Sequence, residues 1–454
     1  MNNKMIAIIA AAIVVIAGVG AFALIGNSDD SDNLPKNITG RLMVFGNANN
    51  DDFIDEDDIA IVKQIIADDN WDENKNPYAD ANHDGKVDET DIEIINKMIK
   101  REPMTLHYVN TKGEVKDVSY PIGNIVVIGS DSMRAMQILG LKDKVVGRNT
   151  SGNPNQYLDP TLNKTIYDNA AVVGPTTSKI DIGLLSNLMD KTSVDVVVTT
   201  ATAFTDIESS VEKLGPKVVR MSFADENTGI NSFLTFGYLA NAEDKAKAVT
   251  GFLDKVQHTL DTKLATLSDE QRVKIVAMAG GGGLYSNKVT SSYGSWGAKA
   301  GAINAITPSM LDGADSKTVA KGDTWQLTKD FAQDYVVYGQ GYNYSYAYLY
   351  DDKIKSDMDY FAGQWTNYTE RFSWDKMLGE NYPNGVVFIN WNLYVPIACA
   401  YLASVFYPDL FGADYGDQVH QAFIDEFYPD LKNINYDVKD RAFCVTYDMV
   451  KDHL

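Results

Sequence analysis

The chain has 454 residues, and 40 Lys and Arg against 62 Asp and Glu give a formal net charge of −22. At about 100–200 residues per domain, this length predicts two or three domains. An acidic surface repels the phosphate backbone, so the composition excludes DNA and RNA as partners. The same acidity suits an exported protein, or one that collects cations.

The N-terminus contains an uncharged apolar run, residues 5–26, between Lys4 and Asp29. This run is long enough to cross the roughly 30 Å hydrocarbon layer as a helix. The charges on either side of it place the N-terminus in the cytoplasm and the rest of the chain outside. Two interpretations stay open: an uncleaved anchor over residues 1–26, and a signal peptide cleaved after the small-x-small motif that ends at Ala23. Both predict an exported protein, either on the extracellular face of the membrane or secreted.

Residues 27–40 are polar and read as a flexible linker. Five Asn-x-Ser/Thr tripeptides, one of them at Asn149, are compatible with export, although such tripeptides often arise by chance.

A short repeat follows the linker, because the stretch that starts at Asn47 recurs from Asp80. Each copy places oxygen-bearing side chains at loop positions 1, 3, 5, 9 and 12 and offers a backbone carbonyl at position 7, which is the calcium-loop spacing of the EF-hand. The predicted ligands are Asn47, Asn49, Asp51, Phe53, Asp55 and Asp58 in the first loop, and Asp80, Asn82, Asp84, Lys86, Asp88 and Asp91 in the second. The alternative interpretation is a solvated acidic turn before a helix.

The two loops differ at position 6, where the chain turns sharply. Gly85 suits this turn in the second loop, and Asp52 is expected to strain it in the first. An apolar stripe at helical spacing follows each loop.

The paired loops, each followed by a single helix, resemble dockerin domains over residues 41–103. The resemblance implies two bound calcium ions, folding coupled to the metal and a cohesin partner on another protein. It also implies that positions 10 and 11, here Glu56-Asp57 and Glu89-Thr90, help to choose that partner. A module that serves only as a calcium-stiffened spacer remains the alternative.

Residues 104–454 have the pattern of an α/β domain. A hairpin is predicted over 105–118, and alternating apolar strands and helices then favour parallel sheet. Each half has an acid near an expected helix start, Asp181 or Asp330, before a strand that begins with Asp. One long helix over 237–267 is predicted to join an N-lobe, 104–236, to a C-lobe, 268–454.

This organisation resembles the periplasmic-binding-protein family for iron–siderophores, haem and corrinoids, which has two Rossmann-like lobes joined by one helix. The resemblance rests on residues 109–121, 125–147, 172–198, 384–396 and 400–412. It implies a non-enzymatic ABC-importer component that binds an iron chelate or related metal complex between its lobes and delivers it to a permease. It further implies that Asp181 and Asp330 dock on the permease.

The ligand is expected at loops that follow the carboxyl ends of strands. The candidate contacts are Ser130, Arg148, Thr200, Tyr285, Trp325, Tyr342, Arg371, Asn390, Trp391 and Tyr394. The arginines suit anionic ligand groups, and the resemblance places Trp325 and Trp391 at the cleft. Corrinoid binders of this family stack aromatic rings from both lobes. The corresponding N-lobe loops here offer Thr176 and Thr200, which favours an iron chelate or haem.

An alternative function is a cell-surface assembly or adhesion protein, whose dockerin-like module binds a cohesin and whose lobes bind glycan or peptide. A glycan hydrolase would need two carboxylates placed across a cleft, and no such pair is evident. Cys399 and Cys444 are expected to be small buried residues, and their pairing is left open.

Overall fold

The computed structural model describes residues 40–149, 158–159, 164–165, 169–174, 179–279, 283–286, 292–318, 323–340, 358–390, 392–433 and 435–454. The chain divides into two compact units, with the boundary between Gly251 and Phe252. The predicted apolar run, residues 5–26, lies outside the described residues. Among the residues that are described, no helix combines the length and the apolar character needed to cross a membrane.

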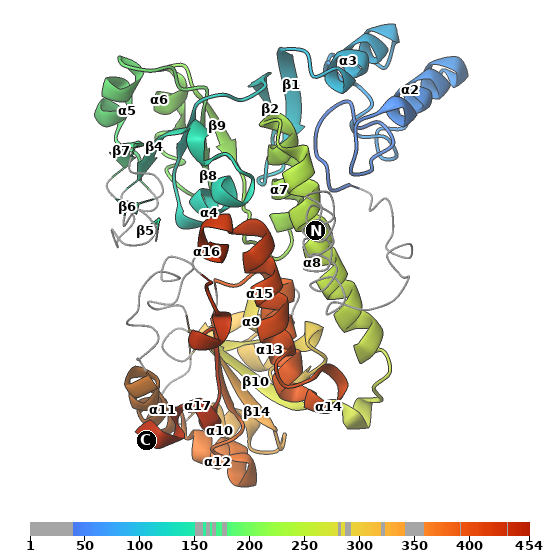
Figure 1. Ribbon diagram of the computed structural model, residues 1–454. Helices are drawn as coiled ribbons and strands as arrows, with labels where there is room; N and C mark the ends of the chain where they lie inside the picture. The colour runs from blue at the N-terminus through green and yellow to red at the C-terminus, as the bar shows by residue number, and fades with distance from the viewer. Residues whose placement is uncertain are drawn as a thin grey trace, which may run out of the picture. The chain divides into compact units, whose positions relative to one another are not determined.

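The first unit begins with a small helical module. Its two helices are α2 (Glu56–Asp68) and α3 (Glu89–Ile99), and each starts at the end of one of the repeated loops (Figure 1). The N-caps are Asp55 and Asp88, and each forms a reciprocal capping box with the residue three positions on. The buried core of the module consists of Ala48, Ile59, Val62, Ile65, Ala79, Ala81 and Ile95.

The rest of the first unit is an α/β lobe. The predicted hairpin is formed by β1 (Met104–Val109) and β2 (Val115–Tyr120), which pair antiparallel. A five-stranded parallel sheet follows, in the order β7-β4-β3-β8-β9. Its strands are β3 (Ile125–Val127), β4 (Val145–Asn149), β7 (Ala171–Gly174), β8 (Val196–Thr199) and β9 (Lys217–Arg220), and the helices around them are α4 (Ser130–Ile138), α5 (Ile182–Met189) and α6 (Glu208–Glu212).

The stretch predicted as one helix over 237–267 contains parts of two helices. α7 spans Gly229–Leu239, and α8 spans Glu243–Leu264, so the long helix begins later than expected. Asn241 between them has a φ of 55°, which ends α7. The two helices then pack closely at Gly237, where a Cβ atom would lie 2.4 Å from the Cβ of Ala246. The boundary between the two units falls within α8.

The second unit is built on a seven-stranded mixed sheet, in the order β13-β11-β10-β14-β15-β16 with β12 also paired to β10. The parallel strands are β10 (Lys274–Ala279), β12 (Ile303–Asn304), β14 (Tyr335–Gln340) and β15 (Val386–Asn390). The antiparallel strands are β11 (Gly283–Tyr285), β13 (Ser316–Thr318) and β16 (Cys444–Val445). The mixed α/β class with parallel sheets is therefore confirmed.

Helices surround this sheet. They are α9 (Ser292–Lys299), α10 (Asp323–Thr328), α11 (Met358–Phe372), α12 (Trp374–Leu378), α13 (Val395–Phe406), α14 (Pro408–Phe411), α15 (Tyr415–Phe427), α16 (Pro429–Lys432) and α17 (Tyr447–Val450). Aromatic rings dominate the core: the buried Trp374 ring lies 5.8 Å from Tyr338 and 5.9 Å from Phe388. Cys399 is buried, Cys444 is partly buried, and both are free thiols.

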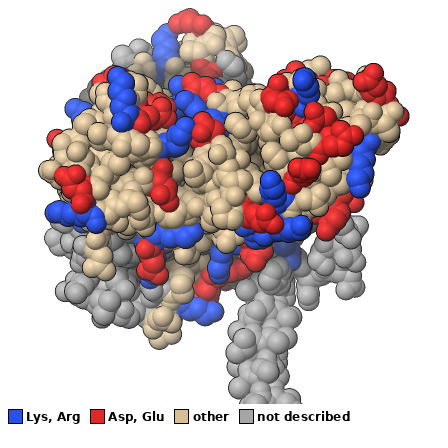
Figure 2. All heavy atoms as spheres, turned by 90° about the horizontal axis from the view of Figure 1, so that it is seen from above, with Lys and Arg blue, Asp and Glu red and all other residues tan. Residues whose placement is uncertain are grey.

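Charged side chains of both signs are interspersed on the face of the molecule seen from above (Figure 2).

A buried histidine gives the second unit a pH-dependent stability. His420 is fully buried, its Nδ1 lies 3.1 Å from the Tyr401 hydroxyl, and burial lowers its pKa to about 3. Because the unfolded chain takes up a proton near pH 6.5 and the folded state does not, stability falls as the pH drops from about 6.5 towards about 3. The slope approaches about 1.4 kcal/mol per pH unit.

We expect His420→Gln to remove this part of the acid sensitivity. The measurement is urea unfolding at pH 7 and pH 5 of the variant and the parent protein. The exposed His453 offers the matched control, His453→Gln. An unchanged pH slope in His420→Gln would contradict the assignment.

Candidate functional site

The two repeated loops have matching internal hydrogen bonds. In the first, the Asp58 carboxylate accepts from the backbone N–H groups of Asn49 (3.0 Å) and Asp55 (2.8 Å). In the second, Asp91 accepts from Asn82 (3.2 Å) and Asp88 (2.9 Å). Position 12 of each loop therefore closes the loop onto its own backbone.

Some of the acids in these loops are buried. Asp58 and Asp91 are fully buried, and Asp80 is 2% exposed. Burial raises the pKa of Asp58 to about 7, with smaller contributions from the nearby Asp51 and Asp55, and burial also raises the pKa of Asp91. Buried carboxylates are costly unless a cation or a donor compensates them. A hard divalent cation with oxygen ligands therefore fits both loops.

The described residues nevertheless contain no cluster of three or more His, Cys, Asp or Glu side chains already arranged to hold a metal ion. Part of the donor set consists of Asn side chains and backbone carbonyls, and several carboxylate oxygens face backbone N–H groups. The two predicted ions are thus not confirmed by the geometry.

The expected strain at Asp52 is wrong. The positive φ angles in the loops occur at Gly85 and, at position 4, at Asn50 (63°) and His83 (56°), whereas Asp52 has no positive φ. The Asp52 carboxylate instead forms an ion pair with Arg41. The first loop therefore turns at position 6 without a positive φ, whereas the second loop has one there, at Gly85.

The second candidate site lies at the carboxyl edge of the N-lobe sheet. Asn149, the last residue of β4, is fully buried, and its Oδ1 accepts from the N–H of Gly129 at the start of α4 (2.9 Å). Its Nδ2 makes no hydrogen bond to the described residues, and the buried hydroxyls of Ser132 and Thr199 are also unpaired. Such buried donors are costly unless a partner arrives, so they mark this edge as a place for a ligand.

Three predicted ligand residues lie around this edge. Ser130 is the first residue of α4, Arg148 is in β4 and Thr200 follows β8, and all three are partly exposed. The Arg148 guanidinium donates to the Asn149 carbonyl at 3.3 Å. The N-lobe sheet thus brings these three residues to one end.

The second unit has a similar polar group at a strand end. Asn390 ends β15, is 3% exposed, and accepts from the Asn392 N–H through Oδ1 (2.8 Å), while its Nδ2 is unpaired among the described residues. Tyr394 is the buried N-cap of α13. Tyr285 in β11 is partly buried.

The remaining predicted ligand contacts of this unit do not lie at a strand end or are not described. Trp325 packs against the aromatic core, and Arg371 is exposed with its guanidinium 5.1 Å from the Phe372 ring. Tyr342 and Trp391 lie outside the described residues, as does Thr176.

The two acids expected to dock on a permease differ in their settings. Asp181 is the N-cap of α5, and its carboxylate accepts from the Leu184 N–H (2.9 Å). Asp330 does not open a helix, because α10 ends at Thr328 and β14 begins at Tyr335, which leaves only a turn. Both side chains are exposed. The structural equivalence expected of the two acids is therefore wrong.

Asn149 is a residue that sequence reasoning missed. The sequence marks it as an Asn-x-Ser/Thr tripeptide, yet a fully buried side chain is not available to a glycosylating enzyme. The signal that identifies it is its position: it directly follows Arg148 at the carboxyl end of a buried strand.

Comparisons with known proteins find one match for a short N-terminal stretch and other matches for the larger part of the chain. Residues 46–100 match the family model of the dockerin type I domain. A search among curated proteins finds no significant match.

Three solved structures share the fold of the larger part. The TroA-like periplasmic binding protein FepB of Veillonella parvula is 15% identical, with a TM-score of 0.53 over 71% of this chain and 96% of that one. A periplasmic solute-binding protein of Veillonella parvula DSM 2008 is 12% identical, with a TM-score of 0.52 over 73% of this chain and 98% of that one. The molybdate periplasmic binding protein MolA of Haemophilus influenzae is 14% identical, with a TM-score of 0.51 over 71% and 98%.

The larger part of the chain therefore has the fold of periplasmic solute-binding proteins. Residues 46–100 form a dockerin type I domain placed before it. All three structures are described as binding proteins.

Proposed function

We propose that this chain is the extracellular solute-binding component of an ABC importer, and that it binds an anionic iron chelate or a related metal complex. The observation that carries the proposal concerns two buried asparagines at the carboxyl ends of strands, Asn149 in the first unit and Asn390 in the second. The Nδ2 atom of each has no hydrogen-bond partner among the residues that the structure describes. Ligands of open α/β sheets bind at these strand ends.

The chemistry of these groups favours a ligand rich in oxygen acceptors. The Oδ1 atoms of both asparagines are already held by backbone N–H groups, so each side chain can offer only N–H donors to a ligand. Arg148 adds a cation next to Asn149. Oxygen-rich anionic complexes, such as ferric chelates, meet these demands.

The test is a thermal-shift screen of the full chain with ferric siderophores, haem and molybdate. We expect a ferric chelate to raise the melting temperature. Asn149→Asp keeps the acceptor that holds Gly129 and removes the donor, so it should weaken binding by about 10–100-fold. The control is Asn124→Asp, since Asn124 lies at the opposite end of the sheet, before β3. Oligosaccharides that stabilise the chain while all metal complexes fail would favour the alternative, a surface assembly protein.

We further propose that the two loops bind one calcium ion each and that the dockerin domain binds a cohesin on another protein. Support comes from the matching loop hydrogen bonds and from the family match over residues 46–100. A calcium titration of the chelated full chain by calorimetry should resolve two sites, with the first loop weaker because it contains fewer carboxylates. No heat of binding would contradict the proposal.

The remaining predictions complete this proposal. Residues 5–26 anchor the chain at the membrane or direct its export, which places residues 41–454 outside the cell. Asp181 and Asp330 contact basic residues of the permease, where charge complementarity favours docking.

A further inference from the structure

The dockerin domain is joined to the N-lobe by a β-bridge at the edge of β1. Residues 41–45, called the docking segment here, pair antiparallel with the free edge of β1 through a bridge between Val44 and Tyr108. The Phe45 N–H donates to the His107 carbonyl, and the Val109 N–H donates to the Met43 carbonyl, both at 2.9 Å. Val44 is fully buried. The segment is thus hydrogen-bonded to the outer edge of the lobe's hairpin.

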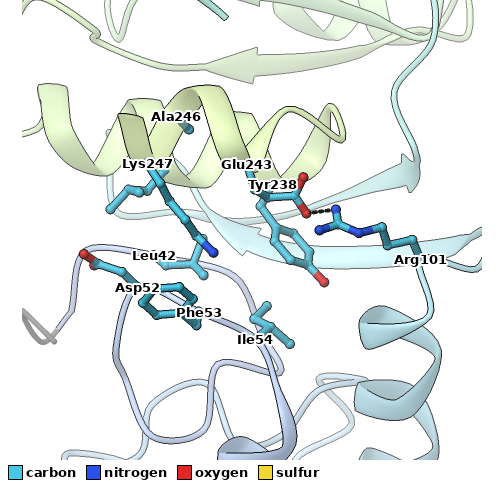
Figure 3. Close-up of a pocket in the computed structure, with 10 residues that line it drawn as sticks. Leu42, Asp52, Phe53, Ile54, Arg101, Tyr238, Glu243, Ala246 and Lys247 are labelled. Atoms are coloured by element: carbon cyan, nitrogen blue, oxygen red, sulfur yellow. Dashed lines mark hydrogen bonds and ion pairs between the residues drawn. The ribbon is translucent and has the colours of Figure 1, made fainter. Parts of the chain in front are cut away.

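Side chains strengthen this attachment along α7 and α8. The Met43 N–H donates to the buried Thr235 hydroxyl (3.0 Å), and the Tyr238 hydroxyl donates to the carbonyl of Met98 at the end of α3 (3.4 Å). Arg101 forms an ion pair with Glu243, the first residue of α8 (Figure 3). The domain is therefore held both at the docking segment and at the end of α3.

The first calcium loop follows the docking segment after one residue, Gly46, and holds the segment by hydrogen bonds. Asn47, fully buried at loop position 1, donates its Nδ2 to the Leu42 carbonyl (2.8 Å) and to the Asp51 carbonyl (2.7 Å). Gly46, between the segment and the loop, has a φ of 107°, and a Cβ there would lie 2.6 Å from the Met98 sulfur. No other residue type fits this turn.

Two further side chains of the first loop reach the segment or α8. Asp52, at position 6, pairs with Arg41 of the docking segment. The Phe53 ring, at position 7, lies 3.8 Å from the Lys247 ammonium of α8. Both line a small pocket of about 40 Å³ between the loop and α8 (Figure 3). The loop and the lobe are therefore in contact at that pocket.

The second loop has different residues at these three positions. Asp80 replaces Asn47, Gly85 replaces Asp52 and Lys86 replaces Phe53. The Asp80 carboxylate accepts from the N–H groups of its own loop, and Gly85 and Lys86 are exposed. The first loop thus departs from the second at the positions that contact the docking segment or α8.

We propose that the first calcium loop is a structural metal site of the solute-binding unit, in which calcium binding stabilises the pairing of the docking segment with β1. The inference rests on the proposed binding of calcium to the loops. Its physical basis is linkage: a metal that binds only the ordered loop also stabilises everything that the ordered loop holds in place. Here that includes the edge of β1 and, through Phe53 and Lys247, the first turns of α8.

The test is hydrogen exchange of the full chain with and without saturating calcium, together with calorimetric calcium titration of the same sample. We expect calcium to slow exchange of the Phe45 and Val109 amides by at least about tenfold. The amides of β10, in the other unit, serve as the internal control and should not change.

Two variants separate metal binding from its effect on the lobe. Phe53→Lys installs the residue of the second loop at a position that contributes only a carbonyl ligand, so calcium binding should persist while protection of Val109 decreases. Asn47→Asp should bind calcium more tightly and yet protect Phe45 less, because its side chain no longer donates to Leu42. Lys86→Ala, at the equivalent exposed position of the second loop, is the matched control.

The outcomes are distinguishable. If calcium binds and the Phe45 and Val109 amides exchange equally fast with and without it, the inference is overturned while the calcium proposal stands. If calorimetry detects no calcium binding, both fail. Should Phe53→Lys prove unfolded by circular dichroism, Lys247→Met removes the same contact from the lobe side. Loss of calcium-induced protection in that variant supports the inference, and full retention overturns it.

Discussion

Removal of calcium from the full chain with a chelator is expected to unfold the dockerin domain, residues 41–103. Its core is a small cluster of Ala, Ile and Val side chains, and domains of this size are marginally stable alone. The buried carboxylates of Asp58 and Asp91 each lie near another acid of the same loop, and this repulsion adds to the cost of burying them. Each calcium ion at about 100 times its Kd adds about 2.7 kcal/mol, so two ions add roughly 5 kcal/mol.

That sum is comparable to the whole stability of many small domains. The measurement is thermal unfolding followed by circular dichroism, in calcium and in excess chelator. We expect a loss of helical signal before heating begins, and recovery of that signal when calcium is restored.

Neighbouring acids in the first loop supply a matched pair of variants. Asp58→Asn removes the buried carboxylate at position 12 and should lower the melting temperature only when calcium is present. Asp57→Asn changes an exposed side chain at position 11, which is not an expected ligand, and should leave stability in both conditions unchanged. Melting curves of the parent protein that coincide with and without chelator would refute the coupling of folding to metal.

The sequence predicted those elements that a repeat or a residue pattern defines. The two loops were found because the ligand positions recur, and the strands β3, β8 and β15 because they are continuous apolar runs. In each case the pattern depends on local chemistry, namely on which side chains a loop or a buried strand requires.

Tertiary contacts account for what the sequence did not reveal. The sequence presents Asn47 as a calcium ligand and Asp52 as a residue that strains its turn. Only the structure shows that they hold the docking segment through Leu42 and Arg41. Asn149 matched a glycosylation tripeptide because three residues do not show whether a side chain is buried in the fold.

The long helix and Asp330 were misplaced for a related reason. Helical spacing continues through 237–242, but the positive φ of Asn241 ends α7 there. Asp330 resembles Asp181 only as an acid in the stretch that precedes a strand. Spacing of this kind identifies residue types and leaves the turn between elements undetermined.

Replacement of Arg220 by Met is expected to be the most damaging single change in the N-lobe. Arg220 ends β9 and is fully buried, and its guanidinium donates to the Glu208 carboxylate (2.5 and 2.9 Å). It also donates to the carbonyls of Thr200 (2.9 Å) and Ala203 (2.9 Å) in the loop after β8. The change leaves the mostly buried Glu208 carboxylate with only Lys116 at 3.6 Å, and it removes the donor of the Thr200, Ala201 and Ala203 carbonyls, which costs about 3–5 kcal/mol.

For a unit of this size the loss corresponds to a fall in melting temperature of roughly 10 °C. The parent protein and Arg220→Met are compared by differential scanning calorimetry, with Lys217→Met as the control. Lys217 lies on the same strand, but its ion pair with Asp117 is about half exposed, so its loss should cost less than about 1 kcal/mol. Equal effects of the two variants would show that Arg220 does not hold the loop.

The same variant tests the ligand site, because the loop that Arg220 holds begins at Thr200. If this loop forms part of the site, Arg220→Met should weaken binding of the best ferric chelate more than Lys217→Met does, at a temperature where both variants remain folded. Removing the acid as well, in Arg220→Met/Glu208→Met, should recover part of the stability, since the mostly buried carboxylate that lost Arg220 is then absent and the exposed Glu114 still pairs with Lys116. It should not recover affinity, because the Thr200 and Ala203 carbonyls still have no donor. Stability and binding that recover together would mean that the loop is ordered by packing alone, and that Thr200 is positioned independently of Arg220.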